Sequence, residues 1–137
     1  MKREVERERE LPAFSLTVGE LEALWQRLAT LFNDDPSDLL SFIDVRLPSE
    51  QLQFASVEEL RQYEHLPHQI TDFTVTLFKN ERSIIIFSGR LLTAKAKVRA
   101  RSETEAWCAG AIDTVYSFIQ THKLWYNWFV SAPIGCQ

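Results

Sequence analysis

The sequence has little of what most catalytic sites require. It contains only four glycines, which disfavours the glycine-rich loops that cradle phosphate groups. The motifs of serine hydrolases, P-loop proteins, dinucleotide-binding proteins and HExxH metalloproteases are also missing. We therefore predict no catalytic residues, no metal ion and no cofactor, and we favour a protein that is not an enzyme.

Cysteines and long apolar runs are also scarce. Two cysteines, Cys108 and Cys136, are too few for a disulfide framework. No apolar run reaches the ~20 residues that a membrane-spanning helix needs. The first ten residues, MKREVERERE, are mostly charged and lack the apolar core of a signal peptide. These features predict a protein of the reducing cytoplasm without a membrane span.

A general excess of positive charge is missing as well. The net charge is −4, whereas proteins that coat nucleic acid are usually basic overall. Residues 90–101 nevertheless hold five of the 15 basic residues and none of the 19 acidic ones, so the remaining chain has a net charge of −9. Any binding of an anionic partner should therefore be local.

What is present indicates an ordinary α+β domain. Helices are predicted at 18–32, 57–66 and 103–122, because a hydroxyl residue and a glutamate three positions later mark each start. The hydroxyl residues at these starts are Thr17, Ser56 and Ser102. Alternating apolar residues predict strands at 39–47, 52–54, 70–78, 83–88 and 91–101, with residues 84–87 apolar on both faces, as in a central strand.

The order of elements is therefore α-β-β-α-β-β-β-α. Short loops between consecutive strands favour antiparallel pairing. We expect a two-layer α+β sandwich with one mainly antiparallel sheet of about five strands and the helices on one face. Residues 12–130 are predicted to form this single domain, residues 1–11 a solvated charged segment and residues 131–137 a flexible tail.

The most informative segment is the last predicted strand. Its basic residues alternate with apolar, mostly small ones, so one face becomes a row of cations and the other a seat for a helix. The cations are Lys95, Lys97, Arg99 and Arg101. We expect the apolar face to receive the last helix, whose small residues allow a close approach: Ala106, Ala109, Gly110 and Ala111.

Two interpretations of the cation row remain open. Its spacing of roughly 7 Å resembles that of successive phosphates, which makes it a candidate site for nucleic acid or an acidic partner. No aromatic residue is interleaved on the cationic face for base stacking, which disfavours nucleic acid. We favour the second interpretation, a solvent-facing row that discourages aggregation and is neutralised by acids on neighbouring strands.

Four aromatic residues, Trp125, Tyr126, Trp128 and Phe129, closely follow the last predicted helix. Such residues are enriched both at binding hot spots and at membrane interfaces. We rank closure of the domain core first, contact in a homo-oligomer second and membrane association third.

Other polar groups suggest no metal site. His65 and His68 are separated by the helix-breaking Pro67 and lack further ligands at a standard spacing, so surface positions are expected. The acidic loop at residues 33–38 lacks the spacing and the glycine of an EF-hand.

The favoured function is thus a non-enzymatic protein-interaction or accessory module that binds a protein partner or a second copy of itself. The alternative is an anion-binding module that uses the strand at residues 95–101. A third hypothesis is an enzyme with an unrecognised site in a groove between sheet and helices. No small-molecule ligand can be named.

Overall fold

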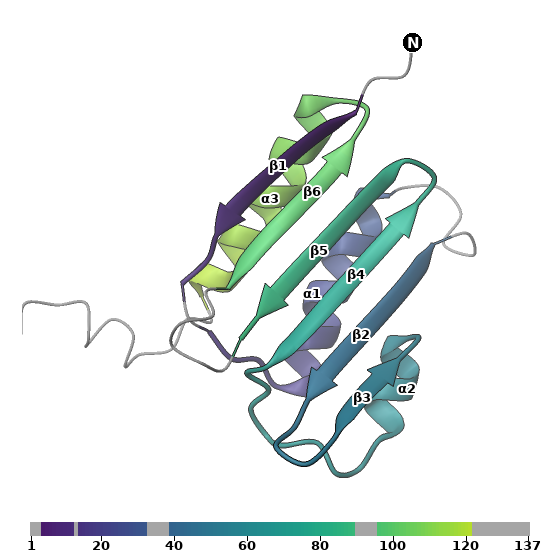
Figure 1. The fold of residues 1–137 in the computed structure, drawn as a ribbon, viewed down its shortest axis with the longest axis vertical. Helices are drawn as coiled ribbons and strands as arrows, with labels where there is room; N and C mark the ends of the chain where they lie inside the picture. The colour runs from purple at the N-terminus through teal and green to yellow at the C-terminus, as the bar shows by residue number, and fades with distance from the viewer. Residues whose placement is uncertain (1–3, 13, 33–38, 90–95, 122–137) are drawn as a thin grey trace, which may run out of the picture.

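The computed structural model describes residues 4–12, 14–32, 39–89 and 96–121. In these ranges one antiparallel sheet of six strands has the order β1-β6-β5-β4-β2-β3. The three helices lie together against one face of it (Figure 1). The elements are β1 (Val5–Glu10), α1 (Val18–Leu31), β2 (Leu40–Arg46), β3 (Gln51–Phe54), α2 (Val57–Gln62), β4 (Phe73–Lys79), β5 (Arg82–Ser88), β6 (Lys97–Ser102) and α3 (Glu105–Gln120). The predicted α+β sandwich is confirmed.

The N-terminal strand is the main difference from the expected fold. Residues 1–11 were expected to be solvated, but Val5–Glu10 pairs with β6 along its whole length and becomes a sixth strand. Five of its six residues are exposed, so it carries no apolar alternation that would have indicated a strand. The pairing places Glu6, Glu8 and Glu10 opposite Arg101, Arg99 and Lys97.

The core fills the space between the helices and the sheet face beneath them. Alternation along the strands turns every second side chain into this layer, where it meets the apolar stripes of α1 and α3. The fully buried members include Leu21, Leu24, Leu28, Ile43, Phe73, Leu77, Ile84, Ile86, Val98, Cys108, Ala111 and Val115. Strand β5 is apolar on both faces as predicted, because Ile84 and Ile86 face this core while Ile85 and Phe87 face the other way.

The helix starts agree with the sequence analysis at two of three positions. Thr17 forms a complete capping box, since its Oγ1 accepts from the Glu20 amide at 3.1 Å and Glu20 accepts from the Thr17 amide at 2.9 Å. Ser56 caps α2 as predicted, although that helix ends at Gln62. The cap of α3 was wrong: Thr104 caps it, and Ser102 is the last residue of β6, where its hydroxyl accepts from the Thr104 amide.

The apolar side of β6 receives α3, as expected. Ala96, Val98 and Ala100 are buried beneath that helix. On the helix, however, Ala111 alone of the four predicted small residues is buried, while Ala106, Ala109 and Gly110 are exposed. The buried stripe of the helix runs along Cys108, Ala111 and Val115 at helical spacing, and it turns the other small residues towards solvent.

Candidate interaction surface

The sheet face opposite the three helices is here called the open face. Among the described residues no element lies over it (Figure 1). Its side chains come from alternate positions of each strand and form rows across the sheet. One such row joins Phe42, Thr76, Ile85, Arg99 and Glu8 on five successive strands.

The middle of the open face is apolar. The large apolar side chains on this face are here called the apolar strip, and Thr74 and Thr76 of β4 lie among them. The strip consists of Leu40 and Phe42 of β2, Phe78 of β4, and Ile85 and Phe87 of β5. Leu40 is 53% exposed and Phe42 is 38% exposed, and the Phe42 and Phe78 rings stack with centroids 6.2 Å apart. An exposed cluster of large apolar side chains on a sheet is typical of an interaction surface.

One side of the strip is bordered by paired charges from β6 and the N-terminal segment, here called the ionic border. Arg99 donates to Glu8 at 2.9 Å, and the Lys97 ammonium lies 3.9 Å from the same carboxylate. Arg101 contacts both Glu4 and Glu6, at 3.0 and 2.8 Å.

The ion pair between Arg101 and Glu6 also shifts the pKa values of both side chains. The hydrogen bond from Arg101 lowers the pKa of Glu6, and the same bond raises the pKa of Arg101. Each sequence-predicted cation that the structure describes therefore has a carboxylate partner, whereas Lys95 lies outside the described residues.

Arg46 of β2 contacts three residues near the Phe87 end of the strip. Its Nε donates to Asp72 at 2.5 Å, its Nη1 donates to the Thr74 hydroxyl at 3.1 Å, and its guanidinium lies 5.2 Å from the centre of the Phe87 ring. A hollow of about 320 Å³ lies where the strip meets the ionic border, and it is lined by Thr74, Ile85, Phe87, Lys97 and Arg99.

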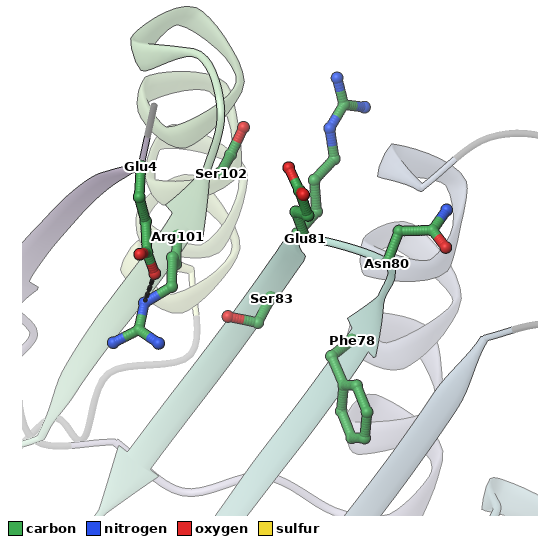
Figure 2. Close-up of a pocket in the computed structure, with 8 residues that line it drawn as sticks. Glu4, Phe78, Asn80, Glu81, Ser83, Arg101 and Ser102 are labelled. Atoms are coloured by element: carbon green, nitrogen blue, oxygen red, sulfur yellow. Dashed lines mark ion pairs between the residues drawn. The ribbon is translucent and has the colours of Figure 1, made fainter. Parts of the chain in front are cut away.

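A second hollow of about 320 Å³ lies at the turn between β4 and β5 (Figure 2). Figure 2 shows Phe78, Ser83 and Arg101 on neighbouring strands, with Arg101 joined to Glu4. Another residue of the lining, Arg82, pairs with Glu103 at 2.7 Å. The arginines of this hollow are thus engaged in ion pairs within the chain, and the hollow extends the open face beyond Phe78.

The other candidate groups do not gather into a site in the described ranges. His65 stacks edge-on against Tyr63 at 5.9 Å, and no three His, Cys, Asp or Glu side chains of these ranges could hold a metal ion together. Cys108 is buried with its thiol 3.5 Å from the Val5 carbonyl oxygen, and burial raises its pKa. The acidic loop at residues 33–38 and the aromatic residues Trp125, Tyr126, Trp128 and Phe129 lie outside the described residues.

The sequence analysis missed the apolar strip. Its strongest signal was the run Ile84–Phe87, which was interpreted as a central strand and not as part of a surface. Phe42 and Phe78 gave no signal of their own, because their contact depends on the pairing of two strands more than 30 residues apart in sequence.

Comparisons with protein-family models, with curated proteins and with solved structures find no match to this chain. Among the described helices, none has the length and apolar character needed to cross a membrane.

Proposed function

We propose that this protein is a non-enzymatic interaction module that associates with a second copy of itself through the open face of its sheet. The observation that carries the proposal is the apolar strip, in which Leu40 and Phe42 of β2, beyond the end of its ladder with β3, are more than one-third exposed. Burying such side chains is favourable by about 25 cal/mol per Å².

The charges beside the strip favour an apolar partner over an anionic one. Arg99 and Arg101 already contact glutamates of the same chain. A polyanion would have to displace these carboxylates before it could neutralise the cations, which argues against the anion-binding alternative. An uncharged apolar surface meets no such competition.

The open face of a second copy is a surface of this kind. Two sheets pack face to face about 10 Å apart when their side chains interdigitate. With the two-fold axis parallel to the strands and centred on β4, β2 of each copy lies over β5 of the other, so Phe42 faces Ile85. Strand β6 of the ionic border then faces β3, where Gln51 and Gln53 project on the same face.

The size of the open face is adequate for such a contact. Six strands spaced ~4.8 Å apart and about 22 Å long span a footprint of roughly 500 Å². The accessible area exceeds this footprint because side chains stand out from the sheet. A standard protein interface buries about 800 Å² per partner, which is of the same order.

Sedimentation of the full chain over a wide concentration range tests the proposal. We expect a concentration-dependent monomer–dimer equilibrium that weakens when Phe42 is replaced by threonine and persists when exposed Ala109, on the solvent side of α3, is replaced by serine. The proposal would be contradicted by a strict monomer at every concentration, or by a dimer whose dissociation constant does not change when Phe42 is replaced by threonine. The aromatic residues 125–129 stay a second candidate interface, and the cytoplasm is the compartment that the composition favours.

A further inference from the structure

Strand β1 is held to the domain with little apolar burial. Its only apolar residue, Val5, is partly buried against the core. On the helix side Arg7 contacts Glu105 at 2.5 Å, and the Arg9 guanidinium lies 3.5 Å from the centre of the Tyr116 ring. The strand also forms its backbone ladder with β6 and the ion pairs of the open face, and its Val5 carbonyl accepts from the Cys108 thiol.

The ion pairs nevertheless make this pairing specific. The Leu11 amide donates to the Ala96 carbonyl at 2.8 Å, and these two residues lie directly opposite each other in the same register. Hydrogen-bonded and non-hydrogen-bonded pairs alternate along an antiparallel ladder, so Glu8 and Arg99 form a non-hydrogen-bonded pair, in which side chains lie closest together. A slip by one residue would move all the glutamates away from the cations.

The outer edge of β1 disfavours direct joining of two complete sheets. Two β1 strands that paired about a two-fold axis would place glutamate opposite glutamate on the open face and arginine opposite arginine on the helix side. Like charges directly opposite are unfavourable. The surface that does match the alternating glutamates is β6, and a second copy can reach it only by replacing β1.

The chain is firmly anchored just after this strand. Phe14 is buried edge-on against Phe73 with ring centroids 5.8 Å apart, and Leu16 exchanges backbone hydrogen bonds with Ile70. Leu11, the residue after β1, is also buried in the core, so the exchanging segment ends between Leu11 and Phe14 and its exchange transfers Leu11 to the core of the second copy.

We propose that β6 is an acceptor for the N-terminal strand of a second copy, so that two chains exchange β1 and form a strand-swapped dimer. The exchange restores the same ladder and ion pairs in both halves, so its free-energy difference is small compared with that of forming a new interface. Salt screens the exposed ion pairs and should speed the exchange. This contact is separate from the open-face association and does not depend on it.

The test is a disulfide across β1 and β6 in the full chain. Glu8→Cys and Arg99→Cys are introduced together with Cys108→Ala and Cys136→Ser. Their Cα atoms, about 4.5 Å apart in a non-hydrogen-bonded pair, suit a disulfide. After incubation and oxidation, non-reducing electrophoresis separates chains linked internally from chains linked in pairs.

We expect covalent dimers whose ratio to internally linked monomer rises about tenfold for each tenfold rise in free monomer, as mass action requires. A single-cysteine control, Gln26→Cys on the exposed side of α1, measures linkage by random collision. Addition of Phe42→Thr should leave the covalent dimer in place, which separates this result from the proposed function.

Three results would overturn the proposal. The first is an internal disulfide alone at every concentration and salt level. The second is a covalent dimer no more abundant than the collision control or lost with Phe42→Thr. The third is failure of both this pair and the pair Glu6→Cys with Arg101→Cys to oxidise, which would also refute the β1–β6 register.

Discussion

Replacing Phe42 by threonine removes the exposed ring on the β2 side of the apolar strip while keeping a residue that favours strands. Phe42 is 38% exposed and stacks on Phe78 across the pairing of β2 with β4. If a phenylalanine offers about 200 Å², the exposed part is roughly 75 Å². At about 25 cal/mol per Å², burying it contributes at most ~2 kcal/mol per copy, or ~4 kcal/mol in a symmetric dimer.

Threonine retains part of this area, so the loss is smaller than that upper figure. Since 1.4 kcal/mol corresponds to a tenfold change in affinity, the dimer dissociation constant should rise by about one to two orders of magnitude. Sedimentation velocity over a concentration series measures this shift directly. The variant Phe42→Leu keeps most of the apolar area and should restore most of the affinity.

The same substitution must leave the fold intact for this reasoning to hold. Phe42 is 38% exposed, so about 125 Å² of its surface is already buried in the monomer; loss of part of this burial and of the stacked contact with Phe78 should lower the free energy of unfolding by about 2–3 kcal/mol. Urea unfolding at a concentration where the wild-type chain is monomeric checks this expectation. A dissociation constant that stays within a factor of a few of the wild-type value, in a folded variant, would refute the assignment of the strip as the interface.

Three further predictions concern the fold. Thr17→Ala removes the capping box of α1 and should lower the free energy of unfolding by about 1 kcal/mol in urea titrations. Arg46→Met removes the half-buried ion pair with Asp72 and should cost about 1–3 kcal/mol in the same assay, more than an exposed pair would. The hydrogen bond from Arg82 lowers the pKa of Glu103 from 4.5. Its stabilisation is therefore complete above the unfolded value and is lost as pH falls through the lower folded value, so Glu103→Gln should destabilise at pH 7 and have no effect at strongly acidic pH.

Local signals predicted most of the architecture because most of its elements depend on local chemistry. The capping box at Thr17 satisfies two amides within four residues, and it appeared in the structure as expected. The sequence Ser102–Glu105 offers two hydroxyl residues as the cap of α3, and the choice between them depends on the partner strand. Ser102 lies opposite Val5 in the sheet, so Thr104 takes the capping position.

Strand β1 could not be predicted by the same means. Its glutamates alternate with arginines, so its pattern fits a solvated segment or helical ion pairs as well as a strand. The feature that makes this segment a strand is the matching row of cations on β6, more than 85 residues away in sequence. The sequence shows both the glutamates of β1 and the cations of β6. That these two segments pair with each other becomes evident only from the assembled sheet.

The two surprises, the apolar strip and β1, are physically linked. Without the glutamates of β1, the cations Arg99 and Arg101 would be free to bind anions on the open face, as the anion-binding interpretation of the sequence suggested. With Glu6 and Glu8 bound to them, the same side chains become a neutral border. Burial of the apolar strip is then the contribution of this face that most favours binding of a partner. A variant that loses both glutamates should accordingly bind a model polyanion such as heparin in a salt-sensitive manner, whereas the wild-type chain should bind it weakly or not at all.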